Sequence, residues 1–277
     1  MTHPVLVIVG AGGMGAAIGR RLGAGRTVVL ADFNEASLES LATSLRGDGH
    51  DVHTQTVDVS DRASVATLAE YAASLGPVTG IAHTAGLSPE QAPVAAILAV
   101  DLVGVAIVLD EFVRVVAEGG AAVVISSMGG HFTNLPPEIE QQLATTPTDA
   151  LAGLEFLSPT NLTNSGAAYS IAKRGNQLRV RTAAPAWGNK GARINSISPG
   201  IISTPMGQLE LAGAGGAGMK AMLEASSAKR LGTPEDIATA AEFLLDPRAS
   251  FITGTDLLVD GGVVAALRAG RLALPGV

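Results

Sequence analysis

The sequence predicts an α/β protein that forms one domain, in which helices cover both faces of a parallel sheet of seven strands. Short runs rich in Val, Ile and Leu alternate with longer Ala- and Leu-rich segments of helical period. This alternation is typical of strand–helix–strand units around a buried parallel sheet. A chain of 277 residues without internal repeats or an interdomain linker fits a single unit of this kind.

The elements follow from the same pattern, taken in chain order. Strands are predicted at Val5–Val9, Thr27–Ala31, Asp51–Val57, Gly80–His83, Ala121–Ser126, Arg193–Ile197 and Asp256–Val259. Helices are predicted at Met14–Gly23, Asn34–Leu45, Asp61–Leu75, Val94–Ala117, Gly166–Trp187 and Pro234–Leu245. Asp61 and Thr233 stand where N-caps are expected. Seven strands that alternate with helices imply a doubly wound sheet.

Two segments interrupt this alternation. Residues 129–165 carry four prolines among many Thr and Asn, and they are too long for a tight connection, so we expect a lid or binding loop. Residues 203–227 combine methionines and leucines with a glycine-rich run. These apolar side chains could belong to a helix core, but the neighbouring glycines favour a substrate lid. An apolar lid implies a hydrophobic substrate, such as a steroid, terpenoid or alicyclic alcohol.

Composition excludes several classes of function. The net charge is -7 and the 18 Lys and Arg residues are scattered, so we expect no nucleic-acid partner. The absence of cysteine excludes disulfides, thiolate nucleophiles and iron–sulfur clusters. His50 and His53 lack a complete set of ligands, and we expect no metal site. No apolar run approaches the ~18 residues that a membrane span needs, and without a signal peptide we expect a cytoplasmic protein.

A dinucleotide-binding turn of the Rossmann type is predicted after the first strand. Gly10–Gly15 reads Gly-x-Gly-x-x-Gly and leads directly into a helix. Glycines at these positions, Gly10, Gly12, Gly13 and Gly15, allow a pyrophosphate to approach the backbone, and its charge then lies at the helix N-terminus. Met14 belongs to the same turn. The alternative is an ordinary glycine-rich turn.

Three further strand ends are assigned to the cofactor. Asp32 has the spacing expected of an acid that binds the adenosine ribose, and its carboxylate would repel a 2′-phosphate. Because the adjacent Phe33 is not basic either, we expect NAD rather than NADP. Asp58, followed by Val59, could receive the adenine amino group, although Asp58 could equally cap the next helix. Thr84, Ala85 and Gly86 form a small-residue turn at the carboxyl edge of the sheet, where ligands bind in such folds.

The catalytic chemistry is predicted from a tyrosine and a lysine at helical spacing. Tyr169 and Lys173 are four residues apart and share one helix face. A neighbouring ammonium group favours the phenolate and lowers the tyrosine pKa, which would make Tyr169 a usable general acid and base. Ser127 follows the fifth strand and delivers a hydroxyl group to the same edge of the sheet. His131 lies nearby without a visible orienting partner, so we interpret it as structural or exposed.

Taken together, these motifs resemble those of the short-chain dehydrogenase/reductase family over nearly the whole chain. The landmarks in register are Gly10–Gly15, Asp32, Asp58, His83–Gly86, Ser127, Tyr169, Lys173, Asn195–Gly200, Thr204, Arg230–Asp236 and Thr253–Gly262. The resemblance implies that Ser127 binds the substrate oxygen and that Tyr169 exchanges its proton. Tyr169 and Lys173 would also contact the nicotinamide ribose. Pro199, Gly200, Ile202 and Thr204 would fix the nicotinamide carboxamide.

The sequence departs from the family pattern in three places. The glycine turn is one residue shorter than usual. Asp101 replaces an asparagine that anchors a proton-relay water. If the Asp101 backbone carbonyl does the anchoring, the change is tolerable, but if its carboxylate reaches Lys173, the pKa of Tyr169 would be less depressed. The stretch between Ser127 and Tyr169 is unusually long, as in the bacterial 3α-hydroxysteroid dehydrogenase/carbonyl reductase subgroup.

The leading hypothesis is an NAD-dependent oxidoreductase that interconverts a secondary alcohol and a ketone. One alternative is a non-catalytic NAD-binding regulator on the same fold, and another is a lyase or epimerase that retains its NAD. Family members usually pair through the helix that follows the insertion, so we expect a homotetramer or homodimer. The insertion would either cover the active site or change the subunit interface.

Overall fold

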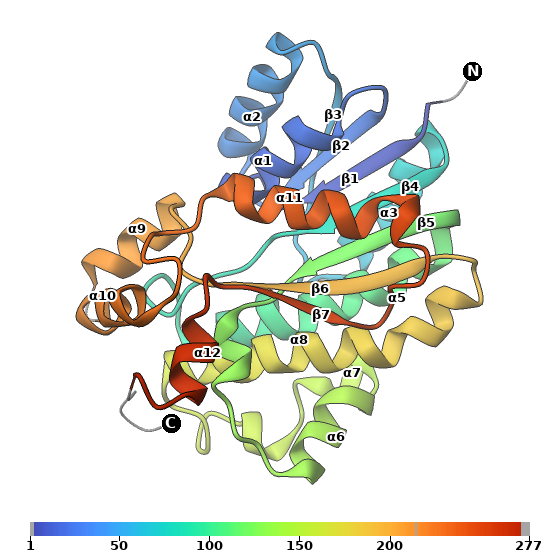
Figure 1. Cartoon of the computed structure of the whole chain (residues 1–277). Coiled ribbons are helices and arrows are strands. Elements are labelled where there is room, and N and C mark those ends of the chain that lie inside the picture. Colours follow the sequence, from blue (N-terminus) through green and yellow to red (C-terminus); the bar gives the residue numbers. More distant parts are fainter. Residues whose placement is uncertain (1–2, 214, 273–277) are drawn as a thin grey trace.

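The computed structural model describes residues 3–213 and 215–272, and its fold confirms the predicted Rossmann-type single domain. All strand pairs of the seven-stranded sheet are parallel, and the strand order is β3-β2-β1-β4-β5-β6-β7 (Figure 1). The strands are β1 Val5–Val9, β2 Thr27–Asp32, β3 Asp51–Thr56, β4 Val78–His83, β5 Val116–Ile125, β6 Arg193–Pro199 and β7 Asp256–Val259. The order reverses between β1 and β4, where such sheets open a ligand crevice.

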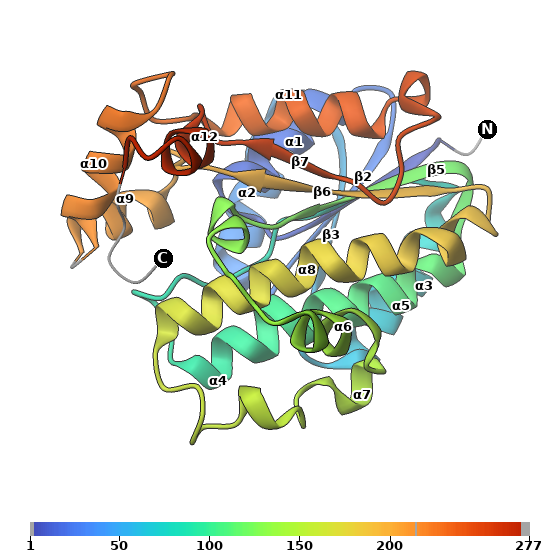
Figure 2. The ribbon, with the colours of Figure 1, turned by 60° about the horizontal axis from the view of Figure 1, so that its bottom comes forward.

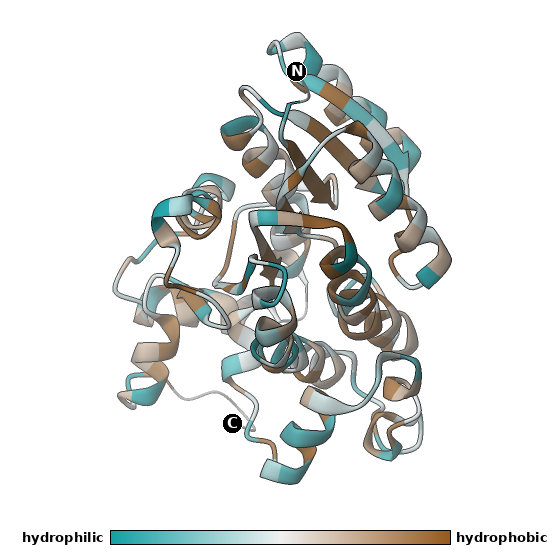
Figure 3. Cartoon of the chain, turned by 90° about the vertical axis from the view of Figure 1, so that its right-hand side faces the viewer, coloured by the Kyte–Doolittle hydropathy of each residue, from teal (hydrophilic) through white to brown (hydrophobic). Residues whose placement is uncertain are grey.

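Helices cover both faces of the sheet, as Figure 2 shows. One face carries α1 (Gly13–Leu22), α2 (Glu35–Gly47) and α11 (Pro234–Leu245), and the other carries α3 (Arg62–Leu75), α5 (Val105–Val115) and α8 (Ser165–Gly188). Strand β1 explains this double cover because Val5, Val7 and Val9 enter one apolar cluster, while Leu6 and Ile8 enter the other. All five are fully buried. Figure 3 shows hydrophobic residues gathered on the central strands.

The predicted helix Val94–Ala117 is wrong as one continuous element. The chain forms α4 (Val94–Ile97), then a π-helix over Leu98–Gly104, and then α5, which ends at Val115. Strand β5 begins directly afterwards, because Val116 already pairs with Val78 of β4. The pairing register shifts after this pair, before Ala121 pairs with Gly80. Short π segments inside helices are frequent at functional sites, and this one contains Asp101.

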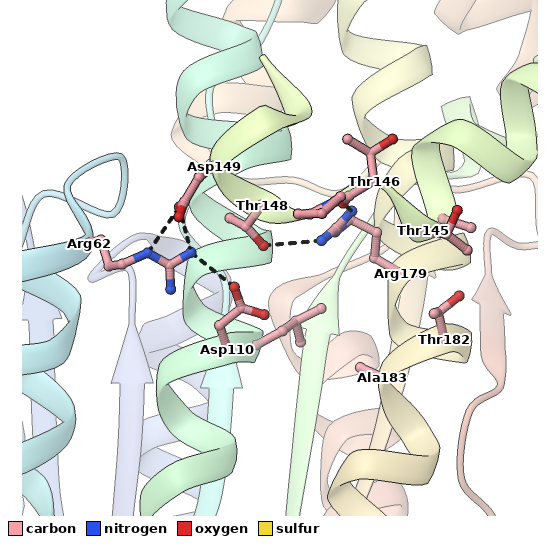
Figure 4. Close-up of a pocket in the computed structure, with 12 residues that line it drawn as sticks. Arg62, Asp110, Thr145, Thr146, Thr148, Asp149, Arg179, Thr182 and Ala183 are labelled. Carbon is pink, nitrogen blue, oxygen red and sulfur yellow. Dashed lines mark hydrogen bonds and ion pairs between the residues drawn. The ribbon is translucent and has the colours of Figure 1, made fainter. Parts of the chain in front are cut away.

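The insertion 129–165 folds into short helices on the outer side of α8. These are α6 (Pro137–Thr145), α7 (Thr148–Leu151) and a 3-10 turn at Glu155–Leu157. In Figure 4, Arg179 of α8 points toward the insertion, where it donates to the Thr146 carbonyl at 2.9 Å and the Thr148 hydroxyl at 3.1 Å. Arg62 of α3 reaches Asp149 at 3.0 Å. The helices of the insertion therefore add a layer outside α8 (Figure 2), while Leu157 and Leu162 near its end pack in the apolar cluster that also contains Tyr169.

The described part of residues 203–227 forms α9 (Pro205–Ala212) and α10 (Gly216–Ala225) at the carboxyl edge of the sheet (Figure 1). A short helix that the sequence did not predict, α12 (Val263–Arg268), packs beside α10. Met219 and Met222 pack against an apolar cluster that includes Met128. Residue 214, in the glycine-rich run, lies outside the described residues. Within residues 3–213 and 215–272, no helix is long and apolar enough to cross a membrane.

Replacing Arg179 tests how the insertion is held. The Arg179→Leu variant leaves buried carbonyl and hydroxyl groups of the insertion without their donor, since Arg179 is only 9% exposed and also donates to the Leu143 carbonyl. We expect the free energy of unfolding in urea to fall by roughly 1–3 kcal/mol, and protease cleavage within residues 136–160 to accelerate. Arg181→Leu, an exposed position on the same helix, is the control. Equal losses of unfolding free energy in both variants would contradict the conclusion that Arg179 holds the insertion.

Candidate active site

The glycine turn after β1 fits a nucleotide pyrophosphate. Gly10 has a φ of +108°, and a Cβ atom there would lie 2.6 Å from the Ala85 backbone nitrogen. A Cβ atom on Gly15 would collide with the Gly10 carbonyl, so both positions require glycine. Gly12, by contrast, faces open space and precedes α1 without a side-chain cap. The N-terminal N–H groups of α1 are therefore free to bind an anion.

A cavity of about 660 Å³ lies along this turn and brings together residues from four strand ends. The predicted cofactor residues that line it are Gly10, Gly12, Gly13, Met14, Asp32, Phe33, Asp58, Val59, Thr84, Ala85, Gly86 and Thr204. The Asp32 carboxylate accepts hydrogen bonds from the Ala11 N–H at 2.6 Å and from the Asn34 N–H at 2.8 Å. These bonds fix the carboxylate at the end of β2, beside the glycine turn.

Six predicted cofactor residues do not line this cavity, and two of them, Tyr169 and Lys173, lie in α8. Gly15 is buried behind the turn, and Pro199 ends the buried strand β6. Gly200 and Ile202 line a separate cavity of about 210 Å³, and the Ile202 side chain packs into the core. Thr204 does reach the larger cavity, where its side chain also accepts a hydrogen bond from the Gly207 N–H as the N-cap of α9.

Asp58 lies at the cavity, just after the end of β3. Its carboxylate accepts hydrogen bonds from the Ser60 N–H at 2.9 Å and the Ser60 hydroxyl at 2.6 Å. The alternative role as a helix cap falls to Asp61, which accepts a hydrogen bond from the Ala63 N–H at the start of α3. Asp58 is therefore oriented by the loop that follows β3.

The catalytic candidates converge from α8 and the end of β5. Asn164 caps α8, and Tyr169 and Lys173 follow in its second and third turns. The Lys173 Nζ atom lies 5.3 Å from the centre of the Tyr169 ring. Ser127 follows β5, and its hydroxyl accepts a hydrogen bond from the Gly129 N–H. Ser126 joins the two elements because its hydroxyl donates to the Lys173 carbonyl at 2.8 Å.

Asp101 reaches Lys173 with its side chain, which decides between the two alternatives left open by the sequence. The Asp101 Oδ2 atom lies 3.2 Å from Lys173 Nζ, and both side chains are almost completely buried. The other carboxylate oxygen accepts a hydrogen bond from the Leu87 N–H. A Cβ atom on Gly86 would lie 3.2 Å from Lys173 Nζ, so a glycine leaves room for the pair.

This pair changes the electrostatics of the tyrosine. Burial raises the pKa of Tyr169, Lys173 and Ser127 lower it, and Asp101 raises it, so the pKa remains above its usual value. Burial alone would lower the pKa of Lys173, but Asp101 and Tyr169 outweigh burial and leave that pKa raised. Lys173 therefore stays protonated, while Asp101 partly cancels its effect on Tyr169.

Two further titratable groups lie near the lysine. His83 is 1% exposed, and burial together with the charge of Lys173 lowers its pKa to about 3, so it is neutral. Glu210 of α9 has a pKa that burial and Glu90 raise. No local sequence pattern points to Glu210, because nothing near it in the sequence shows that α9 turns back toward Lys173.

Removing the Asp101 charge is expected to lower the pKa of Tyr169. The chain has only two tyrosines, so a Tyr71→Phe background leaves Tyr169 as the one phenol to follow by ultraviolet titration. Adding Asp101→Asn removes a carboxylate that raises this pKa, and the titration should move to lower pH by on the order of one unit. Asp110→Asn, in the following helix, serves as the control. An unchanged or higher titration midpoint would refute the conclusion that Asp101 raises the pKa of Tyr169.

Comparisons with known proteins agree with the geometry. The family model described as short chain dehydrogenase matches residues 4–136, and the one described as Enoyl-(Acyl carrier protein) reductase matches residues 143–264. The short-chain dehydrogenase/reductase bsc3 of Alternaria brassicicola is 42% identical and covers 96% of this chain and 98% of its own length. The cis-4-hydroxycyclohexanecarboxylate dehydrogenase of Sinomonas cyclohexanicum is 31% identical, with 94% and 96% covered.

A solved structure extends the similarity to three dimensions. The crystal structure of levodione reductase superimposes with a TM-score of 0.77 at 25% identity, over 96% of this chain and 99% of that chain. Nicotinamide cofactors are bound by proteins of this kind, and the glycine turn and the cavity beside it fit such a group. The motifs, the fold and these relatives agree: the chain belongs to the short-chain dehydrogenase/reductase family.

Proposed function

We propose that the protein is an NAD-dependent oxidoreductase that interconverts a secondary alcohol and a ketone on a hydrophobic substrate, such as a steroid, a terpenoid or an alicyclic compound. The observation that carries this proposal is the convergence of Ser127, Tyr169 and Lys173 at the carboxyl edge of the sheet, next to the cofactor cavity. The named dehydrogenase and reductase relatives support the reaction class.

In the proposed reaction, each residue of the chain has a separate task. The Ser127 hydroxyl binds the substrate oxygen. In the oxidation direction the Tyr169 phenolate takes the hydroxyl proton of the alcohol, and in the reverse direction the phenol returns it to the ketone oxygen. Lys173 favours the phenolate by its positive charge. The bound nicotinamide supplies a hydride acceptor or donor, and the protein contributes orientation and charge stabilisation.

Asp32 supports NAD as the cofactor. Its carboxylate is fixed by two backbone N–H groups at the end of β2, where an acid of this fold binds the ribose hydroxyls. A phosphate on the ribose would meet this negative charge. The neighbouring Phe33 side chain is 74% exposed and offers no positive charge.

The substrate class is supported by the apolar surroundings of α9 and α10. Leu211, Met219 and Met222 pack with Met128, one residue after Ser127, which supports the proposal that residues 203–227 form a lid over a hydrophobic substrate. One relative is named for a hydroxycyclohexane compound, itself a secondary alcohol on a ring. We also propose that the protein forms a homodimer or homotetramer, in which the insertion on the outer side of α8 contributes to the surface of each subunit.

The first test measures turnover of free NAD. Purified protein is mixed with NAD and cis-4-hydroxycyclohexanecarboxylate, or with cyclic and steroid alcohols, and NADH absorbance is followed. Tyr169→Phe should lose roughly 100- to 10,000-fold in turnover, because the proton-exchanging group is removed. Tyr71→Phe is the matched control and should retain activity. Cofactor binding without turnover would favour the regulator, and turnover confined to a retained NAD would favour the lyase or epimerase.

The second test measures cofactor choice. Wild-type protein should bind NADH more tightly than NADPH in a fluorescence titration, and Asp32→Asn should reduce that preference at least tenfold, or about 1.4 kcal/mol. Asparagine keeps an oxygen for the Ala11 N–H while it removes the charge. Asp51→Asn, at the opposite end of the neighbouring strand, should change neither affinity. Equal affinities for NADH and NADPH in the wild type would contradict the proposal.

A further inference from the structure

A second, partly buried polar cluster lies behind Ser127, outside the machinery described so far. The loop after Ser127 forms a short 3-10 turn, Met128–His131. At its end the His131 Nε2 atom lies 2.8 Å from Asp256 Oδ2 on β7, and the two side chains are only 18% and 12% exposed. These residues are 125 positions apart in the sequence, which is why His131 had no visible partner there.

Asp256 extends this contact back to the serine. Its other oxygen, Oδ1, accepts hydrogen bonds from the hydroxyl groups of Ser196 at 2.6 Å and Ser198 at 2.9 Å on β6. The side-chain amide of Gln177 on α8 donates to the Ser198 hydroxyl at 3.0 Å and to the Ser127 carbonyl at 3.4 Å. The polar contacts thus run from Ser127 through α8, β6 and β7 to His131.

The loop also lies very close to α8. A Cβ atom on Gly130 would lie 2.7 Å from Gln177 Nε2 and 2.9 Å from the Arg174 backbone nitrogen, so a side chain would push the loop away. The helix therefore fixes one side of the loop. On the other side, where the chain leaves for the insertion, the His131–Asp256 contact joins the loop to the sheet.

We infer that His131 and Asp256 are positioning residues, which hold the Ser127 loop between α8 and β7 in the geometry that substrate binding and turnover require. The inference rests on the proposed function, since it assigns a task to the surroundings of Ser127. Errors of about 1 Å in the position of a catalytic group lower rates by as much as ~100-fold. A site is most accurate when the residues around it are themselves held by packing and hydrogen bonds.

A double-mutant cycle separates positioning of Ser127 from general stability. His131→Leu removes the contact, and we expect kcat for alcohol oxidation to fall roughly tenfold to 100-fold, with little change in the KM for NAD. In a Ser127→Ala background, the same replacement should change kcat less than about twofold, because there is no serine hydroxyl left to position. His131→Gln keeps a donor at the position of Nε2 and should recover most of the activity. Equal losses in both backgrounds would overturn the inference.

A measurement without turnover keeps the two proposals distinguishable. His131→Leu should accelerate amide hydrogen exchange at Gly129 and Gly130, while NADH binding and exchange in β1 stay as in the wild type. Exchange that stays unchanged at the two glycines would overturn the inference. If the wild-type protein oxidised none of the alcohols, the proposed function would fail, and faster exchange in His131→Leu would still support the contact as the element that holds the loop.

Discussion

The ammonium group of Lys173 is a positive charge buried almost completely inside the protein, and much of the site is organised around it. A charge in such a position is costly unless partners surround it. Asp101 supplies the opposite charge at 3.2 Å, and the Ile125 carbonyl accepts a hydrogen bond at 3.4 Å. Gly86 leaves the space, and His83 remains neutral beside it. Strands β4 and β5, the π-helix and α8 therefore all place groups around the Lys173 ammonium ion.

Most of the fold could be predicted from the sequence because its periodicity is strong. Strand β1 is apolar on both faces, and a parallel sheet buried on both sides requires that pattern. The glycine turn and Asp32 were recognisable because their chemistry depends on neighbours in the sequence. The π-helix was not, since Leu98–Gly104 has the composition of an ordinary helix and no local pattern distinguishes it.

The site was predictable only where its residues follow local motifs. Tyr169 and Lys173 share a helix, so their spacing sufficed to place them together. His131 and Asp256 carry no local pattern, because they meet only when β7 joins the edge of the sheet beside β6. The same limit applies to the insertion. Its prolines predicted a loop, but the arginines that attach it lie outside it, on α3 and in the middle of α8.

The Asp101–Lys173 pair also bears on the direction in which the site works best. A phenol whose pKa stays above its usual value keeps its proton at neutral pH. In the proposed role, such a phenol is ready to donate that proton to a carbonyl oxygen, whereas abstraction of an alcohol proton needs the phenolate. In the proposed reaction, Asp101 would therefore favour ketone reduction near neutrality, and alcohol oxidation would be more efficient at alkaline pH.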